Sequence, residues 1–211
     1  MILTTLLCLA LAQETPTPEA TLAWLQSLDA RPESAQKKPR FPNLTVEDLK
    51  TLKDVRLGGH RASDNKHVFI PAAEFKFLLG LPALENANLV ECDGLNDESL
   101  VFIGKLKGLK SLNLGDAQVT SAGLQSLAGL KNLETLDLGW TKDVGDAAIP
   151  LLARFPNLKV LGLGGTKVTD HGLAGLEACK GLTTLKLAKT KVTPAAIDRL
   201  KKALPGCTVT Q

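Results

Sequence analysis

Leucine recurs along the chain in the short pattern L-x-x-L-x-L, in which the positions marked x are mostly polar. The final apolar residue of the pattern falls at positions 89, 114, 138, 163, 187 and 209, at steps of 25, 24, 25, 24 and 22 residues. An earlier copy, Leu52–Leu57, lies 32 residues before position 89, with Asp64–Ile70 as the expected insertion. The six later copies are Leu84–Leu89, Leu109–Leu114, Leu133–Leu138, Leu158–Leu163, Leu182–Leu187 and Leu204–Val209. A repeat of this length predicts a solenoid whose coils stack on one another.

The last part of each copy alternates between apolar and polar residues, which predicts a short strand with one buried face. The inward residues of successive strands are expected to stack as a ladder along the solenoid. This ladder consists of Leu112, Leu136, Leu161 and Leu185, with Leu114, Leu138, Leu163 and Leu187 beside it. Burying one leucine contributes about 1.5–3 kcal/mol, so the ladder should be a main source of stability.

The segments between strands show regular signals for helix starts and ends. Val168-Thr169-Asp170 and Val192-Thr193-Pro194 each place a threonine at the N-cap and a favourable residue at the first helical position. We expect helices over segments such as Ser121–Ala128 and Asp170–Cys179. The residue before each strand motif is a glycine or an asparagine, which predicts a left-handed end to the preceding helix. These four residues are Gly108, Asn132, Asn157 and Gly181.

The segment Val168–Leu173 reads V-T-D-H-G-L, and a short polar or thiol residue recurs in the turn before such segments. That turn position holds Cys92, Thr141, Thr166 and Thr190, whereas Ala117 departs from it. From Leu44 to Gln211 the chain therefore resembles the cysteine-containing subclass of leucine-rich-repeat proteins, and its closing Leu204–Cys207 resembles the ends of bacterial exported proteins of this type. The resemblance implies an α/β solenoid of about six to seven repeats, with a parallel sheet on the concave face, helices on the convex face, and protein binding as the function.

The N-terminal region divides into two further segments. Residues 1–12, MILTTLLCLALA, resemble a secretory signal peptide, although no lysine or arginine precedes the apolar run. They are too short to span a bilayer. We expect an exported protein, in the periplasm, the cell envelope or the medium, and a cytoplasmic one if the segment is not a signal. Residues 13–43 are rich in proline and charge, and Leu22, Leu25 and Leu28 around Trp24 predict one short helix that either caps the repeat domain at 44–211 or tethers it.

Composition and chemistry offer no sign of an enzyme. Aromatic residues make up only 4% of the chain, and a net charge of +3 is too small to indicate nucleic acid or an anionic membrane. The histidines, His60, His67 and His171, have no metal-ligand spacing, and no nucleophile or phosphate-binding motif occurs. The cysteines beyond Cys8 are odd in number and are interpreted as free thiols. We expect no cofactor, no metal and no catalytic residue.

The polar face of the strands is the candidate binding surface. Its outward residues are expected to form a column, namely Arg56, Asn88, Asn113, Asp137, Gly162, Lys186 and Thr208. Beside it runs a row of small residues, Gly58, Gly115, Gly139, Gly164 and Ala188. Trp140 follows Gly139 and is either an exposed anchor for a partner or a ring lying over Gly165. Asn88, Asn113, Asp137, Trp140 and Lys186 are the predicted contact residues for a protein or peptide.

A second surface is suggested by charge. Lys142, Lys167 and Lys191 each follow the turn threonine and would form a basic ridge, whereas Glu85–Glu98 carries five acidic residues and no basic one. The first hypothesis is a non-enzymatic binding module with a concave surface for a protein or peptide. The alternative is an envelope-associated structural protein that contacts an anionic surface polymer through the basic ridge. Such a charge row is also what an ordinary solvated face looks like.

Overall fold

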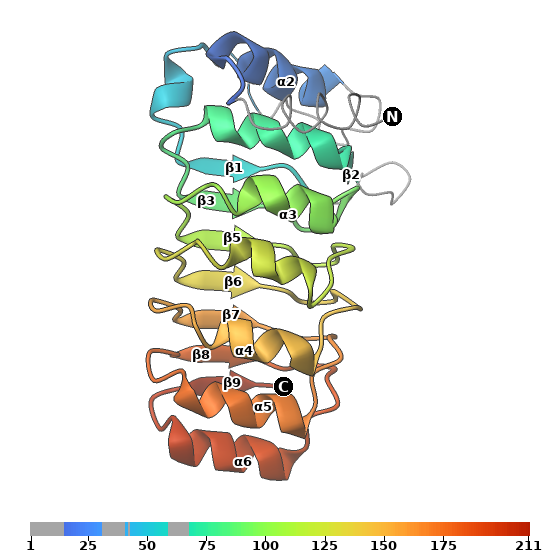
Figure 1. The fold of residues 1–211 in the computed structure, drawn as a ribbon, viewed down its shortest axis with the longest axis vertical. Coiled ribbons are helices and arrows are strands. Elements are labelled where there is room, and N and C mark those ends of the chain that lie inside the picture. The colour runs from blue at the N-terminus through green and yellow to red at the C-terminus, as the bar shows by residue number, and fades with distance from the viewer. Residues whose placement is uncertain (1–14, 31–40, 42, 59–67) are drawn as a thin grey trace, which may run out of the picture.

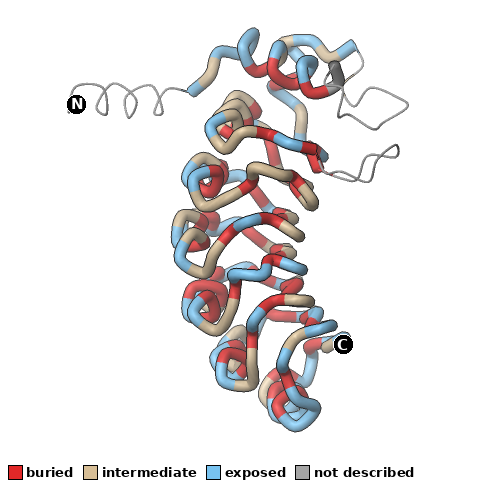
Figure 2. Tube along the Cα trace, turned by 90° about the vertical axis from the view of Figure 1, so that its right-hand side faces the viewer, coloured by how far each residue is buried: buried red, intermediate tan, exposed pale blue. Residues whose placement is uncertain are grey.

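Seven short strands lie side by side in one parallel sheet in the computed structural model, which describes residues 15–30, 41, 43–58 and 68–211 (Figure 1). The strands are β1 (Asp54–Arg56), β3 (Asn86–Asn88), β5 (Ser111–Asn113), β6 (Thr135–Asp137), β7 (Val160–Gly162), β8 (Thr184–Lys186) and β9 (Thr208–Thr210), and they neighbour one another in this order. Helices cover one face of the sheet, and Figure 2 shows them on the outer side of a shallow bow. The predicted solenoid, with its sheet on the inner side, is confirmed.

The predicted leucine ladder runs through the centre of the sheet. Leu112 pairs with Leu136, Leu136 with Leu161, and Leu161 with Leu185. All four side chains are fully buried, as are Leu114, Leu138 and Leu163. Since each coil buries its leucines against the next coil, the core is a continuous spine and not a separate core in every repeat.

The convex face carries short helices, several of them 3-10 helices. They are η1 (Asp48–Lys50), η2 (Ala72–Gly80), α3 (Asp97–Ile103), η3 (Gly123–Leu127), η4 (Asp146–Ala148), α4 (Ile149–Leu152), α5 (Asp170–Gly175), η5 (Leu176–Ala178) and α6 (Pro194–Ala203). The helix predicted over 121–128 is thus a 3-10 helix, and the one predicted over 170–179 changes from α to 3-10 at Leu176. A 3-10 helix rises about 2.0 Å per residue, so it spans the back of a coil with fewer residues.

The helix starts are linked from one coil to the next by aspartate–threonine pairs. The carboxylate of Asp146 accepts hydrogen bonds from the backbone amide and the hydroxyl of Thr169, at 2.8 and 2.6 Å. Thr169 in turn caps α5 by accepting from the amide of His171. The same arrangement recurs in the pairs Asp97–Thr120 and Asp170–Thr193. The predicted threonine caps are therefore also contacts between coils.

The left-handed residues are not where the sequence predicted them. Gly108, Asn132, Asn157 and Gly181 do not adopt positive φ; instead, Asn132 and Asn157 each donate a side-chain hydrogen bond of 2.9 Å to a backbone carbonyl of the preceding coil. Positive φ recurs three residues after the end of β3, β5, β6, β7 and β8, at Glu91, Asp116, Trp140, Gly165 and Lys189. The amides of the first four donate to carbonyls of the next coil, and that of Trp140 donates to the carbonyl of Gly164. Contacts between coils therefore override the usual preference of glycine and asparagine.

The last repeat is shifted by two residues from the predicted alignment. Thr210 pairs with Lys186, whereas Thr208 pairs with Thr184, so Thr208 does not belong to the predicted column. Val209 then lies opposite Leu185, 24 positions later. Leu204, Cys207 and Val209 have the spacing of the strand motif, which explains the predicted alignment. A shift of two residues in the pairing of strands leaves every side chain on the same face of the sheet. The alternation of apolar and polar residues therefore could not reveal the error.

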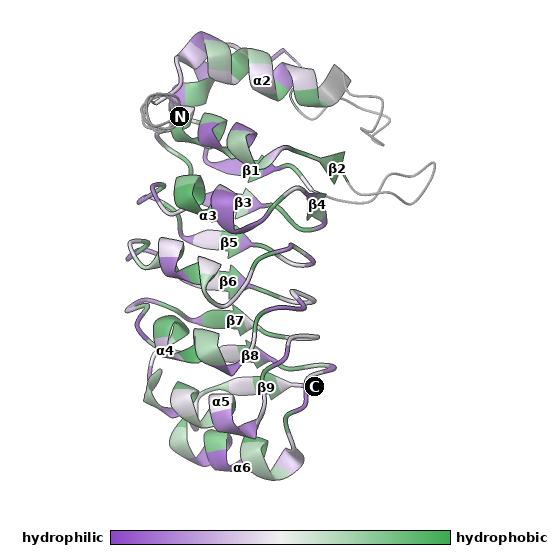
Figure 3. Ribbon diagram, turned by 45° about the vertical axis from the view of Figure 1, so that its right-hand side comes forward, coloured by the Kyte–Doolittle hydropathy of each residue, from purple (hydrophilic) through white to green (hydrophobic). Residues whose placement is uncertain are grey.

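The N-terminal end of the coil is covered by α2 (Pro18–Ala30), in which Figure 3 shows both hydrophilic and hydrophobic residues. Trp24 is buried, stacks on Phe77 of η2 at 5.4 Å between ring centroids, and donates from Nε1 to Glu74 at 2.8 Å. The end of the predicted insertion forms β2 (Val68–Phe69), which pairs with β4 (Cys92–Asp93). The predicted signal at 1–12 lies outside the described residues, within which no helix is long and apolar enough to cross a bilayer.

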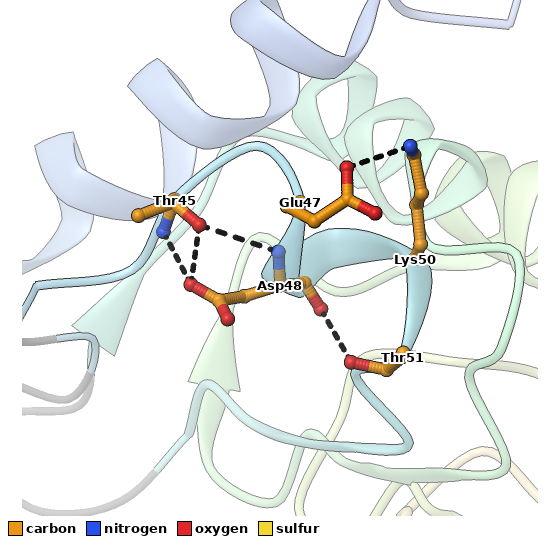
Figure 4. A network of polar contacts seen from close by, with 5 residues as sticks. All are labelled: Thr45, Glu47, Asp48, Lys50 and Thr51. Carbon is orange, nitrogen blue, oxygen red and sulfur yellow. Dashed lines mark hydrogen bonds and ion pairs between the residues drawn. The ribbon is translucent and has the colours of Figure 1, made fainter.

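The first repeat opens with a compact polar network (Figure 4). Asp48 accepts hydrogen bonds from the amide and the hydroxyl of Thr45, at 2.8 and 2.6 Å, and Lys50 pairs with Glu47 at 2.7 Å. The hydroxyl of Thr45 holds the pKa of Asp48 below its usual range. Here the aspartate–threonine contact lies within a single turn, whereas in later coils the same kind of contact links one coil to the next.

Truncating the centre of the ladder should destabilise the protein strongly. We expect Leu136→Ala to lower the free energy of unfolding by about 2–5 kcal/mol, because neighbouring coils leave a cavity that cannot close. Leu136→Met, which conserves volume, should cost less than about 1.5 kcal/mol. Urea unfolding followed by circular dichroism measures both. Equal stability of Leu136→Ala and the unaltered protein would contradict a shared core.

The aspartate–threonine links should make stability depend on pH. The backbone amide and the hydroxyl of Thr193 hold the pKa of Asp170 below its usual range, so the link is fully present above about pH 4 and is lost as pH falls through the lowered folded-state value. Asp170→Asn should lower the stability at neutral pH and have less effect in acid. Urea unfolding at a series of pH values measures the difference, with Asp198→Asn as the control. A difference that does not change with pH would argue against the link.

Candidate partner-binding face

The concave sheet presents two columns of outward side chains, of which the sequence identified one. The second column contains residues two positions earlier in each strand, namely Asp54, Asn86, Ser111, Thr135, Val160, Thr184 and Thr208. The alternation of inward and outward residues along each strand could have identified this second column from the sequence. Both columns line an open hollow of about 630 Å³ over the first strands, which Phe41 borders at one side. The predicted residues Asn88, Asn113, Asp137 and Lys186 all lie in this hollow.

The polar side chains of the predicted column are held by the turn that follows each strand. The Oδ1 atoms of Asn113 and Asp137 accept from backbone amides two residues later, each at 2.9 Å, and Asn88 does the same at 3.3 Å. Because Oδ1 faces the turn, the Nδ2 group of each asparagine is directed away from it. The column therefore offers amide donors whose orientation the backbone fixes.

Asp137 and Lys186 form one ionic contact that crosses an intervening strand. Their side chains are 3.4 Å apart, although β6 and β8 are separated by β7. Gly162 lies between them, and a Cβ atom there would come within 2.4 Å of the Asp137 carboxylate. The glycine thus makes room for the pair. Asp137 and Lys186, both predicted contact residues, can therefore meet because Gly162 has no side chain.

Trp140 lies at the exit edge of the sheet, at a positive φ of 64°. Its ring lies against Gly165, where a Cβ atom would come within 2.6 Å of it, yet the residue remains 56% exposed. The ring therefore contacts Gly165, as one interpretation of the sequence predicted, and is also open to solvent, while its role as an anchor for a partner remains a prediction. With Gly115, Gly139, Gly164 and Ala188 it lines a second hollow of about 600 Å³.

The charged groups proposed for a second surface are partly paired. Lys167, the middle lysine of the predicted ridge, lies 2.8 Å from Asp143, whereas Lys142 borders the hollow beside Trp140. In the acidic stretch, Glu85 contacts Lys110 and Lys53 at 2.9 and 3.1 Å, and hydrogen bonds from these lysines keep its pKa below the usual range. That carboxylate is therefore compensated within the fold.

The remaining reactive groups do not form a site in the described part of the chain. Cys92 and Cys207 are buried and Cys179 is half-buried, all as free thiols, and burial raises the pKa of the thiols of Cys179 and Cys207. His171 is exposed in the first turn of α5. His60 and His67 lie outside the described residues. Within those residues, no group of three or more His, Cys, Asp or Glu is arranged to hold a metal ion.

A side chain at position 165 should displace the Trp140 ring. Gly165 has a φ of +71°, so Gly165→Ala adds both a clash with the ring and backbone strain of about 1–2 kcal/mol. We expect the indole N–H resonance of Trp140, assigned with Trp140→Phe, to move. Gly181→Ala is the control, because a Cβ atom there meets only ordinary contacts. An indole resonance that Gly165→Ala leaves in place would contradict the contact.

Comparison with known proteins agrees with this architecture. A family model described as a leucine rich repeat matches residues 108–128, and no curated protein sequence matches the chain. The structure of internalin C2 from Listeria monocytogenes is 21% identical with a TM-score of 0.57, over 92% of this chain and 86% of that one. A leucine-rich-repeat protein of Leptospira interrogans is 21% identical with a TM-score of 0.46, over 79% of this chain and 50% of its own length, so this chain spans about half of it. The family model shows a leucine-rich repeat at residues 108–128, and the likeness to internalin C2 shows the fold of a leucine-rich-repeat solenoid.

Proposed function

We propose that this chain is a binding module that holds a segment of another protein, or a peptide, against its concave sheet. The observation that carries the proposal is the open hollow with its column of fixed amide donors. Asn88 and Asn113 lie on neighbouring strands, about 4.8 Å apart. Their oriented Nδ2 groups suit carbonyl oxygens, which a peptide backbone supplies at regular intervals. Donors held in place before binding reduce the ordering cost of association.

The charges of the hollow suit a polypeptide better than a uniformly charged polymer. Arg56 and Lys186 lie within it together with Asp54 and Asp137. Groups of both signs select among partners by complementary charge. This mixture of charges therefore favours a polypeptide as the ligand. We also propose that the chain acts outside the cytoplasm, on the basis of the signal-like residues 1–12.

The alternative is an envelope-associated structural protein that contacts an anionic polymer through Lys142, Lys167 and Lys191. Lys167 pairs with Asp143, which reduces the positive charge at the middle of that row. The alternative therefore has the weaker support. The two differ in their response to salt, because exposed charge contacts are screened at high ionic strength.

Peptides selected against the protein test the proposal. Dodecamers from a random phage-displayed library should bind the unaltered chain, and Thr135→Arg should weaken their binding by at least about tenfold by filling the hollow. Thr135 carries none of the hydrogen bonds that hold Asn113 or Asp137, so this variant keeps the turns intact. Isothermal titration calorimetry measures the affinities. The predicted contact residue is tested in parallel by Asp137→Arg.

The matched control is Asp198→Arg, which makes the same charge change as Asp137→Arg on the exposed outer face of α6. It should leave peptide binding unchanged. If Thr135→Arg binds the selected peptides as well as the unaltered chain, the concave face is not the binding surface. Steep loss of binding to an anionic polysaccharide with added salt, unaffected by Trp140→Ala, would instead favour the alternative.

A further inference from the structure

Hydrogen-bond donors lie in one row at the N-terminal end of the concave sheet. Arg56 of β1 pairs in register with Asn88 of β3, and Asn88 pairs with Asn113 of β5. All three side chains line the hollow of about 630 Å³. Neighbouring strands lie about 4.8 Å apart, so a guanidinium and two carboxamides follow one another across the hollow.

The donors of this row are not used inside the described part of the chain. The side-chain oxygens of Asn88 and Asn113 accept from turn amides at 3.3 and 2.9 Å, which leaves their Nδ2 groups without an acceptor among the described residues. The guanidinium of Arg56 is exposed and likewise has no ion pair or hydrogen bond with those residues. Farther along the column, Asp137 and Lys186 pair with each other. The first three positions therefore have donors in excess, which only water or a ligand rich in acceptors can match.

A carboxylate is the group that matches this row best. An ionised carboxylate has acceptor oxygens only, and its charge is opposite to that of the guanidinium. Arginine pairs with carboxylates through N–H groups held in a rigid planar fork, and such charged hydrogen bonds are roughly twice as strong as neutral ones. A carboxylate on Arg56 can also accept from Asn88 on the next strand, which leaves Asn113 for a backbone carbonyl of the same segment.

Asp54 limits the negative charge that this end of the hollow can accept. It projects from the same face of β1 as Arg56, two residues earlier, which places their Cα atoms about 6.6 Å apart. Its carboxylate accepts a hydrogen bond of 2.6 Å from Asn86 of β3, in the second column. A single carboxylate between Arg56 and Asn88 lies one column away from Asp54, whereas closely spaced anions would also meet Asp54 and be repelled. These charges favour one acidic group on a peptide over an anionic polymer.

We propose that the partner contributes one carboxylate, which pairs with the guanidinium of Arg56 and accepts a hydrogen bond from Nδ2 of Asn88. This inference rests on the proposed function and specifies the chemistry of the partner at one position. The carboxylate belongs either to an acidic side chain or to the C-terminus of a peptide, and the experiment distinguishes these two sources. The competing possibility is that the row accepts neutral backbone carbonyls alone.

The experiment titrates the isotope-labelled full chain with matched pairs of peptides. Ac-GGEGG-NH2 carries a side-chain carboxylate and Ac-GGQGG-NH2 is its neutral isostere, whereas Ac-GGGGG-OH carries a C-terminal carboxylate and Ac-GGGGG-NH2 is its neutral counterpart. The Nε–H resonance of Arg56, assigned with Arg56→Gln, reports binding. We expect a saturable shift with a carboxylate peptide, which should bind at least about fivefold more tightly than its neutral counterpart because only the carboxylate forms a charged hydrogen bond. The pair with the larger difference identifies the source of the carboxylate.

Substitutions test the guanidinium and the amide separately, with the Nδ2 resonances of Asn113 as the readout. Arg56→Gln should weaken the carboxylate peptide by at least about fivefold and remove its advantage over the neutral one. Asn88→Asp keeps Oδ1 for the turn, as Asp137 does in a later coil, but replaces the Nδ2 donor by a negative oxygen, so it should weaken the same peptide. The control is Arg154→Gln, which makes the same charge change as Arg56→Gln at an exposed position just after α4 and should leave binding unchanged.

Equal binding of the charged and neutral peptides in both pairs, a preference for the carboxylate that persists in Arg56→Gln, or no shift at all would overturn the proposal. Library peptides whose binding responds to Thr135→Arg but not to Arg56→Gln would overturn this inference alone and leave the concave binding face in place. Library peptides that respond to neither substitution would overturn the proposed function itself.

Discussion

The stacking of buried leucines between coils is the interaction on which the rest of the structure depends. Leu112, Leu136, Leu161 and Leu185 are fully buried and lie opposite one another in register, so the core of each coil continues into the next. Each coil must therefore return the chain to the same place and direction. The positive-φ residue that follows β3, β5, β6, β7 and β8 and the aspartate–threonine links between helix starts both serve this return. The sequence repeats because every coil must return the chain in the same way to stack on the coil before it.

The same register that aligns the leucines also aligns the outward residues, and this gives the protein its candidate binding surface. Asn88, Asn113 and Asp137 in the column are held by backbone amides, so their polar atoms are oriented before a partner arrives. The surface differs from one coil to the next at positions where a residue departs from the repeat. Gly162 allows Asp137 to reach Lys186 across a strand, and Gly165 allows the Trp140 ring to lie flat while remaining exposed. Specificity would then arise from a few departures from an otherwise uniform scaffold.

Sequence patterns predicted the features that depend on burial and missed those that depend on contacts between coils. The leucine period identified the strands and their inward residues, because burial has a strict chemical signature. It could not detect the two-residue shift at Thr208, since alternation is unchanged by such a shift. It also misplaced the left-handed residues: Asn132 uses its side chain to bond the preceding coil, while Asp116 and Trp140 adopt positive φ. The contact role of Asn88, Asn113, Asp137, Trp140 and Lys186 remains a prediction.

The most direct test of the account is to observe which leucines touch. Methyl-labelled protein, with assignments from conservative single substitutions, would show nuclear Overhauser contacts between methyl groups in solution. The account predicts contacts from Leu112 to Leu136, from Leu136 to Leu161 and from Leu161 to Leu185, and none between Leu112 and Leu161. Absence of the contacts between successive leucines, or contacts that skip a coil, would contradict the shared spine and with it the concave surface built on it.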